Sequence, residues 1–87
     1  MDFLHYEFRL KKGDVVEVKL DKQANVQLLD EINFNNYKKG KKYNSIGGFS
    51  KDLLVNLSSP YKGLWHLAVD LGGHKGTVKA SVQISKS

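Results

Sequence analysis

The residue types best suited to chemistry gather in one stretch of the sequence. It combines carboxamides, tyrosines and lysines, namely Asn33, Asn35, Asn36, Tyr37, Lys38, Lys39, Lys41, Lys42 and Tyr43. Carboxamides and phenols hydrogen-bond sugar hydroxyls or phosphate esters, lysines attract anions, and an exposed tyrosine stacks on a ring or base. We therefore predict that these residues bind a small polar or anionic ligand, or a partner protein. The alternative is an ordinary solvated loop in which Phe34 and Tyr37 are core anchors.

Positive charge is concentrated in the same stretch. The formal net charge is +5; residues 1–37 carry five basic and seven acidic side chains, whereas residues 38–87 carry nine basic and two acidic ones. Four lysines within residues 38–42 could contact the phosphates of a nucleotide or nucleic acid in a salt-sensitive manner. Clustered lysines also serve solubility or protect a sheet edge. Because the chain lacks an RNA-recognition pattern and a groove-binding helix, nucleic acid is the least favoured partner.

The other reactive residue types form no catalytic or metal-binding motif. His5, His66 and His74 lack the spacing of a zinc site, and the chain has no cysteine. The glycine-rich residues 72–76 lack the full phosphate-loop pattern and a following helix. We therefore expect a non-catalytic domain with no metal site and no cofactor. His5 and His66 could meet across neighbouring strands, with Asp70 on the same outer face, as partly exposed residues.

Alternating apolar side chains indicate a β-protein. They predict strands near residues 4–10, 16–20, 26–30, 43–46, 53–57, 65–69 and 77–84, separated by glycine-containing turns. Residues 31–42 are expected to form a long loop with at most one helical turn, and Trp65 to occupy the centre of the core. We predict an all-β fold: one small antiparallel β-sandwich, jelly-roll-like, of about seven or eight short strands over residues 1–87.

Three groups of phrases carry a family resemblance. They are Phe3–Tyr6 with Gly13–Val18, Ala24–Asp30 with Asn33–Gly40, and Gly63–Gly73 with Gly76–Val82. Together they resemble the bacterial family known as domain of unknown function 1883, over nearly the whole chain. The resemblance implies a compact β-sandwich that stands alone or precedes a Toll/interleukin-1 receptor (TIR) domain, and it supplies no catalytic residues. A looser similarity to small jelly-roll modules that bind sugars concerns the fold alone.

The remaining expectations concern location and function. The first residues lack a signal-peptide pattern, no stretch is apolar enough to span a membrane, and the absence of cysteine suits a reducing compartment. We expect a cytoplasmic binding or sensing module with no membrane partner. The alternative is a structural or oligomerisation domain for a fused or partner effector, in which exposed edges or an apolar face self-associate. Ile46, Phe49 and Leu54 do not fit the inward-facing pattern and are expected to be exposed.

Overall fold

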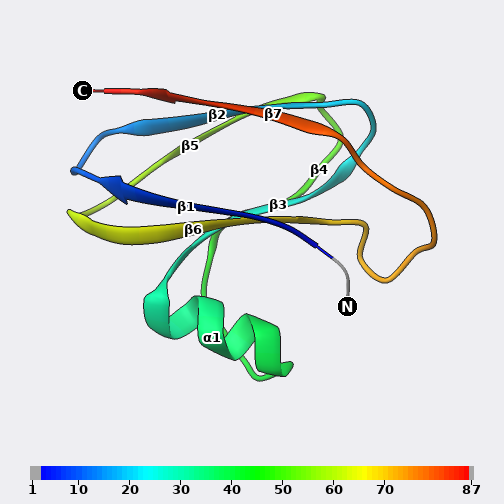
Figure 1. Ribbon diagram of the computed structural model, residues 1–87, viewed down its shortest axis with the longest axis horizontal. Helices are drawn as coiled ribbons and strands as arrows, with labels where there is room; N and C mark the ends of the chain where they lie inside the picture. Colours follow the sequence, from blue (N-terminus) through cyan, green and yellow to red (C-terminus); the bar gives the residue numbers. More distant parts are fainter. Residues whose placement is uncertain (1–2, 87) are drawn as a thin grey trace.

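The computed structural model describes residues 3–86 and contains two antiparallel sheets and one helix (Figure 1). The elements are β1 (Leu4–Leu10), β2 (Val15–Leu20), β3 (Ala24–Asp30), α1 (Glu31–Lys39), β4 (Ile46–Ser50), β5 (Leu54–Ser58), β6 (Gly63–Asp70) and β7 (Ala80–Ser85). One sheet has the order β1-β6-β3-β4 and the other β5-β2-β7. The chain changes sheet at every connection except the one from β3 through α1 to β4. The predicted all-β sandwich is confirmed.

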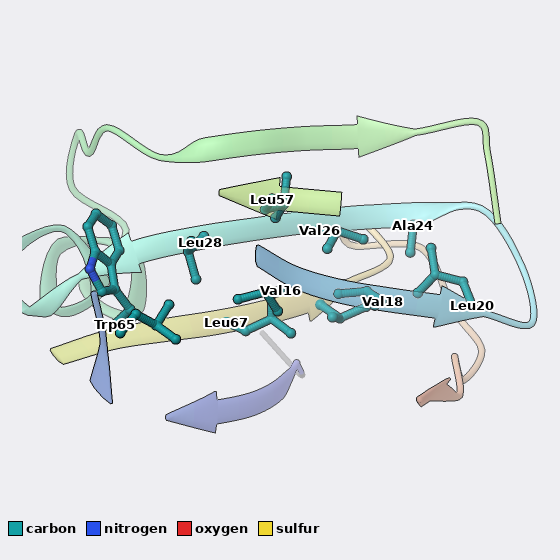
Figure 2. Packing of buried hydrophobic residues seen from close by; sticks show 11 residues of the cluster. Val16, Val18, Leu20, Ala24, Val26, Leu28, Leu57, Trp65 and Leu67 are labelled. Carbon is teal, nitrogen blue, oxygen red and sulfur yellow. The ribbon is translucent and has the colours of Figure 1, made fainter. Parts of the chain in front are cut away.

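The main core lies between the two sheets and consists of the inward-facing residues of the strands. The side chains point toward one another across the layers (Figure 2), and the most buried of them are Val16, Val18, Val26, Leu28, Leu67 and Val69. Trp65 is also buried, but it lies at one end of this cluster and not at its centre, so that prediction was wrong. Its indole nitrogen donates a hydrogen bond to the carbonyl oxygen of Tyr61 at 3.0 Å.

The expected loop over residues 31–42 is instead mostly a nine-residue helix, α1. The Asp30 side chain caps its first turn by accepting a hydrogen bond from the Asn33 backbone N–H at 2.9 Å. Gly40 ends it in the left-handed conformation, with φ at +73°. Phe34 and Tyr37 are both buried, as the anchor hypothesis predicted, and they pack on the outer face of the four-stranded sheet. None of the helices in the described residues has the length and apolarity to cross a membrane.

The fourth strand begins later than predicted and contains Gly47 and Gly48, which follow the end of the predicted strand. Strand β4 pairs with β3, and the Gly47 backbone comes so close to this neighbour that an added Cβ would overlap the carbonyl oxygen of Val26. Glycine therefore permits the close approach instead of ending the strand. Phe49 and Leu54 are 62% and 50% exposed, as expected. Ile46 is half-buried against the main core, so its predicted exposure was wrong.

Candidate functional site

The outer face of the four-stranded sheet carries buried polar residues beneath α1. Strand alternation directs His66 and Asp70 of β6 away from the main core, together with Asn25 of the paired strand β3. The helix covers this face, so His66 and Asp70 are only 2% and 3% exposed. The prediction that His66 is a partly exposed strand residue was wrong, because its strand position is covered by an element from elsewhere in the chain.

Asp70 is the centre of a hydrogen-bond network that fastens α1 to the sheet. Its Oδ2 accepts a hydrogen bond from the Tyr37 hydroxyl at 2.6 Å. Its Oδ1 accepts from the Asn25 side-chain amide at 2.9 Å and from the Gly72 backbone N–H at 2.7 Å. Burial, reinforced by the hydrogen bond to Asp70, raises the pKa of Tyr37 well above its usual value. Tyr37 is therefore a structural residue whose ring and hydroxyl are both occupied inside the protein.

A second cluster joins β1, β6 and α1 through two histidines. His5 Nε2 lies 2.9 Å from His66 Nδ1, and His66 Nε2 lies 3.1 Å from a Glu31 carboxylate oxygen. The Phe34 ring stacks on both imidazoles, with centroid separations of 4.4 and 4.2 Å. The predicted meeting of His5 and His66 is confirmed, whereas Asp70 belongs to the other network.

Burial lowers the pKa of His5 below its usual value, and the neighbouring His66 lowers it further. Both effects favour the neutral imidazole of His5. Over residues 3–86, no group of three or more histidine or acidic side chains is arranged to hold a metal ion. The contacts of His5, His66 and Phe34 join the helix to the sheet by packing and hydrogen bonding.

The four lysines of the predicted site lie on the exposed end of α1 and in the segment after it. We call Lys38, Lys39, Lys41 and Lys42 the lysine surface; all four are exposed. The segment is held beside the helix because the Asn44 backbone N–H donates to the Asn33 side-chain oxygen at 2.8 Å. The rings of Tyr43 and Tyr37 also pack perpendicular to each other, at 5.3 Å between centroids. The fold therefore brings lysines of the helix and lysines of the following segment into one region.

The three asparagines of the predicted site have different surroundings. The Asn33 side chain is occupied, since its amide nitrogen donates to Asp30 at 2.9 Å and its oxygen accepts from Asn44. Asn35 and Asn36 are half-buried, and within the described residues their side-chain amides form no hydrogen bond. Asn35 lies one helical turn before Lys38 and Lys39, on the same side of α1. The structure thus brings Asn35 next to the lysine surface and uses Asn33 internally.

The lysine surface has no compensating acidic partner among residues 3–86. The ammonium group of Lys38 lies 4.8 Å from the centroid of the Phe34 ring, which positions it by a cation–π contact. The partial negative charge at the carboxyl end of α1 offsets a fraction of the lysine charge. The remainder is positive charge exposed to solvent, which attracts anions.

Sequence reasoning did not foresee two hollows. The larger, about 630 Å³, lies between the start of β1 and the segment before β7, and its lining includes Leu4, Val69, His74, Lys75 and Val78. The smaller, about 170 Å³, lies at the start of α1 against Tyr61 and Trp65.

The Tyr61 hydroxyl lies beside the smaller hollow and donates to the Asp30 carboxylate at 2.6 Å. This hydrogen bond raises the pKa of Tyr61. Burial acts to raise the pKa of Asp30, but the hydrogen bonds from Tyr61 and Asn33 outweigh it and leave the value below its usual range. The side chains of Asp30, Asn33 and Tyr61 beside the smaller hollow therefore hold the start of the helix.

One comparison with known proteins gives a match. The protein-family model described as "Domain of unknown function (DUF1883)" matches residues 1–87, the whole chain. No curated protein and no solved structure matches the chain.

Proposed function

We propose that this chain, which belongs to the family described as domain of unknown function (DUF1883), is a non-catalytic binding module for a small anionic ligand. The observation that carries the proposal is the lysine surface. It presents four exposed ammonium groups within five consecutive residues, and none of the four forms an ion pair with a described residue. The amide of Asn35, next to this surface, adds a hydrogen-bond donor and an acceptor.

Rigidity of the support favours binding. The Tyr37–Asp70 hydrogen bond and the Asp30 cap hold α1 in place, and the Asn33–Asn44 contact holds the segment that follows Lys42, before a ligand arrives. A preorganised site loses less conformational entropy on binding than a mobile loop. The long lysine side chains still have to be ordered, so the expected affinity is moderate.

The ligand must carry several negative charges. A single exposed ion pair contributes only about 0–1 kcal/mol, so one carboxylate on one lysine gives no measurable complex. An organic phosphate with three or more charges can reach several lysines at once. Exposed charges are screened over about 8 Å at physiological ionic strength, so binding should weaken as salt is added.

The proposed setting is the bacterial cytoplasm, where the module stands alone or precedes a TIR effector domain. The family resemblance of the sequence supports this setting, and the absence of cysteine suits a reducing compartment. In this role a bound anion would change the surface that the module presents to its effector.

Thermal unfolding in the presence of defined probes tests the proposal. The probes are inorganic tripolyphosphate, ATP and a cyclic dinucleotide, with a neutral sugar for comparison. A ligand at 100 times its dissociation constant stabilises the folded state by about 2.7 kcal/mol, which at this size raises Tm by on the order of 10 °C.

Two double variants locate the site. Lys38→Gln/Lys41→Gln removes two charges from the lysine surface. Lys22→Gln/Lys51→Gln removes two exposed charges at the far ends of β3 and β4, away from α1. The proposal predicts that a phosphate probe stabilises the wild type and the second variant but not the first. If both variants lose the stabilisation equally, net charge alone attracts the probes and the site assignment is wrong. If no phosphate probe stabilises the wild type, the proposal is contradicted.

A further inference from the structure

Strand β1 is an edge strand with one unpaired side. Within residues 3–86 it pairs only with β6, and β7 pairs only with β2. Because β4 and β5 contact each other at one lateral side of the sandwich, β1 and β7 lie at the opposite side. Figure 1 shows β1 in dark blue and β7 in red along this side. We call it the open side.

Most of the inward-facing residues of the open side are only half-buried, although they belong to the apolar pattern of the core; Leu10, at the end of β1, is the buried exception. The half-buried residues are Leu4, Tyr6 and Phe8 on β1, and Ala80, Val82 and Ile84 on β7. One strand further in, Leu67 of β6 is fully buried. An edge strand with free backbone groups and incompletely buried apolar side chains is a template for pairing with another chain.

The charged residues on the outer face of β1 indicate which strand could pair with its free edge. Glu7 and Arg9 are both exposed, lie two residues apart, and therefore project on the same face. Within the described residues Arg9 forms no ion pair, and Glu7 has only a long contact of 3.8 Å to His66. A strand carrying an acid and a base at this spacing is complementary to an antiparallel copy of itself, since opposite charges facing across a sheet are stabilising.

We propose that two copies of this chain pair antiparallel through β1, with the two-fold axis at Phe8. This register sets Glu7 of each copy opposite Arg9 of the other. It also sets the two Phe8 side chains opposite each other and Tyr6 opposite Leu10, all on the face that points into the core. A four-stranded sheet in each copy thus becomes one continuous eight-stranded sheet, and the half-buried residues of β1 become covered.

Charge also disfavours two alternative pairings. An axis at Glu7 would set the two Glu7 carboxylates against each other. Pairing through the full length of β7 would set Lys79 of one copy opposite Lys86 of the other, which is repulsive as well. The Glu7–Arg9 register is therefore the one that the charges of the open side favour, and it is independent of the proposed anion site.

Sedimentation equilibrium of the purified chain, from about 1 µM to about 1 mM, tests the proposal because the dimer forms by mass action. The wild type is expected to pass from monomer to dimer over this range. Glu7→Arg and Arg9→Glu each set like charges face to face twice, and each should raise the dissociation constant by about tenfold or more. The swap Glu7→Arg/Arg9→Glu restores both ion pairs and should recover the wild-type constant.

Lys19→Glu is the matched control, since it reverses an exposed charge on the outer face of the central strand β2. Circular dichroism and thermal unfolding establish that each variant is folded. A wild type that stays monomeric to the highest concentration would overturn the proposal. A dimer that is insensitive to the single reversals, or a swap that fails to restore it, would do so too. The lysine-surface variant Lys38→Gln/Lys41→Gln should dimerise normally.

Discussion

Replacing Tyr37 with phenylalanine removes one oxygen atom and, with it, the hydrogen bond to Asp70. That bond is short, at 2.6 Å, and both partners are buried. Hydrogen bonds to charged groups contribute about 1.5–3 kcal/mol, and a buried acceptor that loses its donor is costly. Asp70 keeps its donors Asn25 and Gly72 on the other oxygen. We therefore expect Tyr37→Phe to lower the free energy of unfolding by about 2 kcal/mol, or Tm by about 10 °C for a domain of this size.

Urea unfolding followed by Trp65 fluorescence measures this change, and Tyr43→Phe is the control. Tyr43 lies next to Tyr37 but is exposed, and its hydroxyl forms no hydrogen bond within residues 3–86. The control should change stability by no more than about 0.5 kcal/mol. A double-mutant cycle with Asp70→Asn isolates the pair, because the Tyr37→Phe effect should shrink when the carboxylate is absent.

A Tyr37→Phe variant as stable as Tyr43→Phe would refute the reasoning that Asp70 fastens α1 to the sheet. Folded Tyr37→Phe should also bind anions as the wild type does. The sequence pattern placed Tyr37 in the ligand site, whereas in the structure its hydroxyl donates a buried hydrogen bond to Asp70.

Three further predictions concern the elements that hold α1. The pKa of His5 is lowered in the folded state, so the unfolded state binds more protons below about pH 6.5; stability is fully present above that pH and falls as the solution is acidified. His5→Gln should flatten this acid loss in urea titrations between about pH 7 and 5, and an unchanged slope would assign the loss to other groups. Gly40→Ala puts a Cβ on a residue with φ at +73° and open surroundings, so backbone strain alone should lower the free energy of unfolding by about 1 kcal/mol. An unchanged midpoint of urea unfolding would contradict that expectation. Asp30→Ala removes the helix cap and the acceptor of Tyr61, and we expect a loss of about 1–2 kcal/mol in thermal unfolding. Asp52→Ala, at an exposed position, is the surface comparison and should change stability by no more than about 0.5 kcal/mol.

The strands could be predicted because their signal is local. Residues such as Val16 and Val18 alternate with charged neighbours, and this period survives into the structure without change. Helix α1 was missed because only Phe34 and Tyr37 among its nine residues are buried, which is too few for a recognisable 3.6-residue period. Its local signals were the caps, an aspartate before the first turn and a glycine after the last.

The site was only partly predictable because burial of its residues depends on distant elements. Exposure of the lysines follows from their charge and was predicted. The internal role of Tyr37 depends on Asp70, 33 residues further along the chain, and could not be read from spacing. His66 has the sequence position of a solvent-facing strand residue, but α1 packs over it. Sequence patterns identify the face of a strand and do not reveal what later covers that face.

The most direct test of the central claim is a titration of ATP, at two salt concentrations, into three proteins. They are the wild type, Lys38→Gln/Lys41→Gln, and the equally charged control Lys22→Gln/Lys51→Gln. Isothermal calorimetry should give binding to the wild type and the control that weakens as salt is raised, and none to the lysine-surface variant. Binding that survives in the lysine-surface variant, or that is lost equally in the control, would contradict the assignment of the anion site to α1.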